Sequence, residues 1–391
     1  MSSPVRSWIS PMRARSSQEP HRASTPLEAF FDLCFVVAVA AAGVPLHHSL
    51  VEHRVAFGVG HFLLVFFAIW WAWMNFTWFA SAYDTDDDVY RITTLVQIAG
   101  ALVLAAGIEP AFDNGDFRVV TIGYVIMRLA LVGQWLRAAR ADRERRPVAL
   151  RYAVGVAIVQ VLWILRLLLP DALLLAAFLA LVVAELAVPI WAERARGGPT
   201  TFHPHHIVER YGLFTLIVLG ETVSAATLAV RGVLDQGGHE TAPLLELAVA
   251  GLVIVFALWW IYFDRSAHNL LNTLRGSMMW GYGHYFIFAA AAAVGAGLSV
   301  AVDHATEAAE ISDTLNGYAV AVPVAVYLFF VWLLHLRPHQ SGPMLVVFPV
   351  GTVLILLAPL GPESIKVIAG ILVVLVAILV TLGRRVPDPV G

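Results

Sequence analysis

The chain has 391 residues, of which 59% are hydrophobic and 14% are charged, and its formal net charge at pH 7 is -3. Soluble domains are about 45–50% apolar and about 25% charged, so this composition excludes a soluble enzyme and a disordered chain. The single cysteine excludes an internal disulfide, and the absence of a basic excess argues against nucleic acid as a partner. The composition predicts an all-α polytopic membrane protein whose main partner is the lipid bilayer.

Twelve stretches are apolar and long enough to cross a bilayer, which needs about 20 helical residues. In chain order they are 27–46, 56–83, 92–112, 118–138, 149–169, 171–192, 207–230, 243–264, 278–302, 315–336, 343–360 and 364–383. Arginines concentrate in alternate loops, most densely in the loop that carries Arg137, Arg140, Arg143, Arg145 and Arg146. Because cytoplasmic loops hold the excess of basic residues, this alternation predicts that both termini lie in the cytoplasm.

The layout suggests two halves between two tails. Residues 1–26 lack apolar periodicity and are expected to be a disordered cytoplasmic tail, while 27–200 and 201–385 form six-helix halves and 386–391 a C-terminal tail. A Phe-Ala-aliphatic-Trp-Trp string begins at Phe67 and again at Phe256, six spans later. Six is an even number, so the pattern indicates a parallel internal repeat, an arrangement common in transporters. Chance similarity between apolar helices is the alternative.

Several ionisable residues lie inside the apolar stretches, where each costs at least about 2.5–3.5 kcal/mol. Glu28 and Asp32 are four residues apart and therefore share one face of the first span. Span 7 begins with Glu209 and Arg210, and its Glu221 lies about 18 Å deeper along a helix. One interpretation is a pathway for a solute or for protons, with Arg210 and Arg128 as counter-charges. The other is static pairing between helices, for instance of Arg210 with Asp32.

The second span ends in aromatic and acidic residues. Trp71, Asn75 and Trp78 recur at helical spacing and could line a cavity, with Asn75 as its polar group, although an interfacial aromatic belt explains Trp78 equally well. The run that follows is rich in Asp. Here we expect Asp84 or Asp86 to cap the next helix rather than to bind a cation. The cluster around His203 is likewise expected to cap a helix, and no metal site is predicted.

These strings resemble the bacterial low temperature requirement A (LtrA) family. The resemblance rests on Glu28-Ala-Phe-Phe-Asp-Leu, on Trp70-Trp-Ala-Trp-Met-Asn with Asp84-Thr-Asp-Asp, and on the longer string from His206 to Glu221. It implies a multi-spanning protein of the bacterial inner membrane, linked by the family name to growth in the cold. The family motif falls on Glu28, Phe31, Asp32, Trp71, Asp84, Asp86, Arg91, Glu209, Arg210, Gly212, Gly220 and Glu221.

The sequence contains no phosphate-binding loop and no hydrolase or zinc-protease motif, so neither an enzyme nor a cofactor is expected. The favoured hypothesis is a secondary, proton-coupled transporter of a small solute. Its pathway would use Glu28, Asp32, Trp71, Asn75, Arg128, Glu209, Arg210 and Glu221. The alternatives are a membrane-embedded enzyme or lipid-handling protein, and a non-catalytic envelope or sensory protein whose charges only pair helices.

Overall fold

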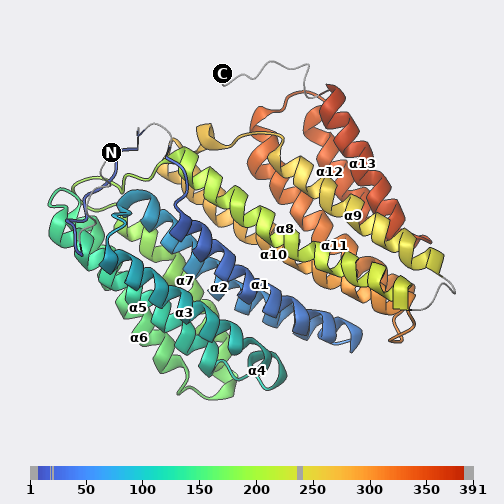
Figure 1. Ribbon diagram of the computed structural model, residues 1–391, viewed down its shortest axis with the longest axis horizontal. Coiled ribbons are helices and arrows are strands. Elements are labelled where there is room, and N and C mark those ends of the chain that lie inside the picture. Colours follow the sequence, from blue (N-terminus) through green and yellow to red (C-terminus); the bar gives the residue numbers. More distant parts are fainter. Residues whose placement is uncertain (1–7, 18, 20–21, 236–240, 383–391) are drawn as a thin grey trace. The chain divides into compact units, whose positions relative to one another are not determined.

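The computed structural model describes residues 8–17, 19, 22–235 and 241–382, and these residues form helices and loops without a strand (Figure 1). The α-helices are α1 (Pro26–Val51), α2 (Val55–Tyr83), α3 (Asp88–Ala106), α4 (Ile108–Asp113), α5 (Arg118–Ala141), α6 (Arg146–Arg166), α7 (Asp171–Ala192), α8 (Pro204–Asp235), α9 (Thr241–Phe263), α10 (Leu274–Ala305), α11 (Asp313–Val331), α12 (Met344–Leu357) and α13 (Ser364–Leu382). Short turns of helix are η1 (His268–Leu271), η2 (Trp332–Leu336), η3 (Arg337–His339) and η4 (Ala358–Leu360).

Each of the twelve predicted stretches coincides with a helix. The third stretch divides at Gly107 into α3 and α4, and the tenth continues from α11 into η2, a π-helical turn. Among the described helices, ten are long and apolar enough to cross a membrane. The helical, polytopic architecture predicted from composition is therefore confirmed, and the chain is an integral membrane protein.

The chain forms two compact units. Unit 1 comprises Met1–Ala41 and Phe67–Arg210, and unit 2 comprises Ala42–Phe66 and Tyr211–Gly391, so the division passes through α1 and α2. In unit 1, α5 packs against both α3 and α6, and α6 packs against α7 (Figure 1). In unit 2, α10 packs against α11, and α13 packs against α9. The predicted halves at 27–200 and 201–385, and the parallel repeat, stay predictions.

Two glycines set the close approach of α3 and α5. A Cβ atom on Gly123 would lie 2.3 Å from the backbone nitrogen of Leu104, and one on Gly100 would lie 2.9 Å from the Gly123 carbonyl oxygen. Small residues let membrane helices approach until their backbones touch, and van der Waals contact then replaces the hydrophobic effect that lipid does not supply. We infer that a larger residue at either position would push α3 and α5 apart.

The segment that precedes α1 contacts unit 1 at several points. Met12 is 1% exposed, the Arg15 backbone N–H donates to the Ala82 carbonyl at 2.8 Å, and the Ser10 N–H donates to Asp87 at 2.9 Å. The sequence suggested a disordered tail over residues 1–26 and contains no apolar periodicity that would signal these contacts.

The cap of α3 differs from the prediction. Neither Asp84 nor Asp86 caps this helix, because Asp87 accepts the Tyr90 backbone N–H at 2.7 Å and is the N-cap residue. Asp86 instead forms a bidentate pair with Arg91, at 2.7 and 2.9 Å. The choice of Asp84 and Asp86 was wrong by a few residues because neighbouring Asp residues in one run are equally good caps from sequence alone.

Candidate functional site

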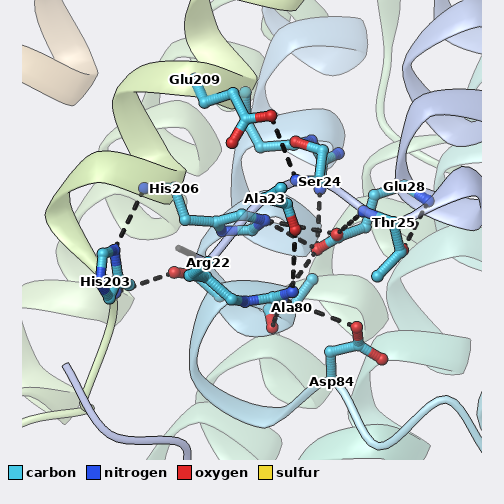
Figure 2. Close-up of polar contacts among 12 residues, drawn as sticks. Arg22, Ala23, Ser24, Thr25, Glu28, Ala80, Asp84, His203, His206 and Glu209 are labelled. Atoms are coloured by element: carbon cyan, nitrogen blue, oxygen red, sulfur yellow. Dashed lines mark hydrogen bonds and ion pairs between the residues drawn. The ribbon is translucent and has the colours of Figure 1, made fainter. Parts of the chain in front are cut away.

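Unit 1 buries a cluster of ionisable side chains where α1 and α8 begin and where α2 ends. Its carboxylates are Glu28, Asp32 and Asp84, which are 0%, 0% and 7% exposed, and its cations are Arg22 and Arg210, which are 6% and 0% exposed. Figure 2 shows Arg22 between Glu28 and Asp84, with the His206 ring approaching Glu28 from α8. We refer to these five residues together with His206 as the acid cluster.

Local helix chemistry fixes the position of Glu28. The Thr25 carbonyl accepts the first helical bond of α1, from Ala29 at 2.9 Å, so Thr25 is the N-cap residue and Pro26 is the first helical residue. Glu28 accepts the Thr25 backbone N–H at 2.7 Å, and the Thr25 hydroxyl accepts the Glu28 N–H at 3.3 Å. This reciprocal pair is a capping box, and it places a carboxylate at the positive end of the helix.

Asp32 forms the strongest pair of the cluster. The Arg210 Nε and Nη2 atoms donate to the two Asp32 oxygens at 2.8 and 2.5 Å, and the Trp73 indole N–H donates to Asp32 at 2.7 Å. A bidentate guanidinium–carboxylate pair offsets much of the cost of burying both charges. The pairing of Arg210 with Asp32, given above as an example of static pairing, is therefore present, and it joins α1 to α8 within unit 1.

Glu28 links this pair to the other cations. Its Oε1 atom lies 3.2 Å from Arg210 Nη1, 3.2 Å from His206 Nε2 and 3.3 Å from Arg22 Nη2. Arg22 also donates to the Ala80 carbonyl oxygen at 3.3 Å, which ties the segment before α1 to α2. Glu28 is consequently the centre of the cluster.

Asp84 is the least compensated acid. Its Oδ2 atom lies 3.6 Å from Arg22 and 3.9 Å from Arg15, and within the described residues this buried oxygen accepts no hydrogen bond. Its Oδ1 atom accepts the Asp86 backbone N–H at 3.0 Å. Burial, reinforced by the negative charge of Glu28 and opposed by Arg22, raises the pKa of Asp84 to about 6. Asp84 can therefore gain or lose a proton close to neutral pH.

A second buried cluster of unit 1 surrounds Glu185 of α7, which is fully buried. This carboxylate accepts hydrogen bonds from Trp71 at 2.9 Å, Tyr124 at 2.7 Å, Arg128 at 2.8 Å, Gln160 at 2.9 Å and Trp163 at 3.3 Å. The five donors come from α2, α5 and α6. Arg128, proposed as a counter-charge for the pathway, thus pairs with Glu185 and lies outside the acid cluster.

The remaining pathway candidates have other partners or surroundings. Glu209 is partly buried and accepts the Ser24 backbone N–H at 3.2 Å (Figure 2). Asn75 donates to the Trp71 carbonyl oxygen at 2.8 Å within α2, and the Trp71 side chain binds Glu185. Glu221 belongs to unit 2, where its side chain is exposed.

Three other positions of the family motif, Phe31, Gly212 and Gly220, carry no ionisable group and differ in how closely they are packed. Phe31 is buried and its ring lies 4.6 Å from Phe35 and 4.0 Å from Phe76, between centroids. In unit 2, a Cβ atom on Gly212 would lie 3.2 Å from the Phe263 ring, whereas one on Gly220 would meet nothing within 4 Å.

Two members of the acid cluster, and one residue that donates a hydrogen bond to it, were not predicted. Arg22 lies in the supposed tail, His206 was treated only as part of a capping group, and Trp73 was not separated from the neighbouring tryptophans. A usable signal was present for the cap: Thr25-Pro26-Leu27-Glu28 has the spacing of a capping box directly before an apolar run. The capping expectation for His203 is confirmed, because His206 donates its backbone N–H to the His203 ring at 3.3 Å.

Comparison with known proteins identifies the family of the chain. Residues 23–382, nearly all of the chain, match the family described as bacterial low temperature requirement A protein (LtrA). The chain belongs to the LtrA family. This LtrA protein is also 26% identical, over 294 residues, to an uncharacterized protein of Rhizobium meliloti (strain 1021), in an alignment that covers 69% of this chain and 67% of the relative.

Proposed function

We propose that this LtrA protein is a proton-coupled secondary transporter of a small solute in the bacterial inner membrane, and that the acid cluster carries the coupling proton. The observation that supports this proposal is the charge count of the cluster. Three buried carboxylates, those of Glu28, Asp32 and Asp84, face two buried guanidinium groups, those of Arg22 and Arg210. The partly buried Arg15 lies 3.9 Å from Asp84 but pairs with Glu19 at 2.5 Å. The buried carboxylates therefore outnumber the buried guanidinium groups by one.

A proton is the simplest compensation for that charge. A buried charge without a partner is costly, so a cluster with one surplus carboxylate favours binding of a proton or another cation. Two acceptors are available within the cluster. Asp84 has a pKa of about 6, and the His206 ring lies 3.2 Å from Glu28. The cluster therefore has the chemistry of a site that loads a proton at mildly acidic pH and releases it above neutral pH.

The solute experiment uses the full-length protein reconstituted into liposomes that contain a pH-sensitive dye. A panel of amino acids, sugars, organic acids and organic amines is added outside, with and without an imposed pH gradient. We expect at least one solute to drive proton flux that requires the protein, and we expect Asp84→Asn to abolish the proton flux while solute exchange continues.

Asp86→Asn is the matched control, because Asp86 lies in the same loop but pairs with Arg91 outside the cluster. This variant is expected to retain coupled flux. Solute uptake without proton flux in the unmodified protein would contradict the proposal, and so would an Asp84→Asn variant with normal proton flux. Failure of every solute in the panel would count against transport.

A purely structural role is the second candidate, and the Glu185 cluster favours it. That carboxylate has one guanidinium partner and four further donors, so its hydrogen-bonding capacity is occupied by the protein itself. If the acid cluster behaves as the Glu185 cluster does, neutralising Asp84 will change the stability of the protein and nothing else.

A further inference from the structure

A cavity of about 700 Å³ lies among four helical segments of unit 2 and shares no residue with the acid cluster or the Glu185 cluster. The first half of α9, the end of α10, the start of α11 and the segment from η4 into α13 line it. Binding sites for small molecules have volumes of about 300–1,000 Å³. The cavity therefore has room for a small organic molecule.

Two groups of charged side chains line this cavity. Lys366 of α13 pairs with Glu363 at 2.8 Å and also with Glu246 of α9. Asp313, the first residue of α11, lies 3.1 Å from a ring nitrogen of His304 in α10. When His304 is neutral, three carboxylates and one ammonium group give the lining a formal charge of -2.

The ends of the helices offset only part of this negative charge. Asp313 and Glu363 lie at the starts of α11 and α13, where each positive helix end is equivalent to about half a unit charge. Glu246 is the sixth residue of α9, beyond the first turn in which this effect acts. The end of α10 adds a negative partial charge to the same cavity. The lining consequently stays negative and favours a cationic ligand.

The uncharged lining residues indicate what kind of cation fits. The Asn316 Oδ1 atom is buried, and within the described residues it accepts no hydrogen bond. A primary ammonium group donates three hydrogen bonds, which suits carboxylate and amide oxygens. None of the described lining residues is aromatic, so a cage of aromatic faces for a quaternary ammonium ion is not formed by them. Apolar wall is supplied by Ala250, Ala301 and Ile365, which are buried.

We propose that this cavity is a binding site for small aliphatic primary amines. The ammonium group lies at the carboxylates, and the carbon chain lies against the apolar wall. Because the acids form two groups, on α9 with α13 and on α11, a diamine binds more tightly than a monoamine. A bare metal ion suits the cavity less well, since among the described residues no three His, Cys, Asp or Glu side chains gather into a metal site.

The test is calorimetric titration of the full-length protein, purified in detergent at low ionic strength, with 1,4-diaminobutane. We expect saturable binding of one molecule per chain, weaker binding of butylamine, and no binding of 1,4-butanediol, which has the same carbon chain without charge. Tetramethylammonium carries a charge but donates no hydrogen bond, so it should bind about tenfold more weakly than the diamine. Added salt should weaken diamine binding, because salt screens exposed charges.

Substitutions in the cavity should change the affinity in opposite directions. Asp313→Asn and Glu363→Gln should each weaken diamine binding by about threefold to tenfold, because each removes one attracting charge. Lys366→Gln should strengthen binding by a similar factor, because the Lys366 ammonium competes with the ligand for the same carboxylates. All three residues are exposed, so the variants should fold, and a structural role alone would not raise the affinity for an amine.

Glu310→Gln is the matched control, because Glu310 is an exposed acid three residues before Asp313 and lies outside the cavity lining. This variant should bind the diamine as the unmodified protein does. Absence of saturable binding, equal binding of 1,4-butanediol, or weaker binding by Lys366→Gln would overturn the site. So would a loss of affinity in Glu310→Gln as large as that in Asp313→Asn. The proposal concerns binding alone and is tested without a membrane, so its failure and the failure of the proposed transport are distinguishable.

Discussion

Replacing Asp84 with Asn should make the protein more stable at neutral pH. The pKa of Asp84 is about 6 in the folded chain and 3.8 ordinarily, a difference of about 2 units. Since each unit corresponds to about 1.4 kcal/mol, ionising Asp84 costs the folded state up to about 3 kcal/mol. Asn removes that cost, and its amide oxygen can still accept the Asp86 backbone N–H.

The sign of the effect fixes its pH window. Because the folded pKa is raised, the stability associated with protonated Asp84 is fully present below about pH 4 and is lost as the pH rises through about 6. The assay is thermal unfolding of the detergent-purified protein at a fixed scan rate between pH 4 and pH 8. We expect equal Tm values for Asp84→Asn and the unmodified protein at pH 4, and a Tm several degrees higher for the variant at pH 7.5.

Two outcomes would contradict this expectation. One is a Tm difference that does not change with pH, which would mean that the substitution acts through packing rather than through ionisation. The other is destabilisation at neutral pH, which would mean that the carboxylate of Asp84 is stabilised by Arg22 more than it is penalised by burial. Asp86→Asn, in the same loop, serves as the control and should leave the pH dependence of the Tm unaltered.

Three further substitutions test the buried pairs. Arg210→Gln leaves the buried Asp32 charge without its partner and should lower the free energy of unfolding by about 3–5 kcal/mol. Adding Asp32→Asn should restore part of the Tm, and a double variant no more stable than Arg210→Gln alone would contradict the pairing. Glu185→Gln replaces one acceptor oxygen by an NH₂ group that faces donors, so we expect a loss of several kcal/mol in thermal unfolding, and an unchanged Tm would show that the five bonds do not form. Asp87→Ala removes the cap of α3 and should lower stability by about 1 kcal/mol or more, whereas Asp87→Asn should retain most of the cap.

The fold was predictable because the bilayer imposes a simple rule on sequence. Each spanning helix must satisfy its own backbone hydrogen bonds over about 20 apolar residues, so hydropathy alone located all twelve stretches. The division of α3 and α4 at Gly107 and the π-helical turn after α11 were not predictable in this way, because hydropathy carries no information on where the hydrogen-bond pattern of a helix changes. The cost of charge in lipid likewise selected Glu28, Asp32 and Arg210, which are buried and paired, but it also selected Glu221, which is exposed.

Partners across long sequence separations were harder to predict. The pairing of Arg210 with Asp32 followed from opposite charge on apolar spans, but the partner of Arg128 did not, because Glu185 is one acid among several and no pattern selects it. Arg22 was not predicted because it precedes the first span, and only the path of the chain before α1 brings its side chain to Glu28. The capping box at Thr25 and Glu28 was readable from spacing, and it would have shown that Glu28 has a local structural role as well as a charge.

The proposed transport function requires the acid cluster to bind one proton near neutral pH, at or beside Asp84. Proton uptake by the purified, weakly buffered protein, measured with a pH electrode or an indicator dye as the pH is lowered from 8 to 5, tests it directly. We predict that Asp84→Asn takes up about one proton fewer per chain than the unmodified protein over this range, while Asp86→Asn takes up the same number. Equal uptake by the Asp84→Asn variant and the unmodified protein would contradict the claim.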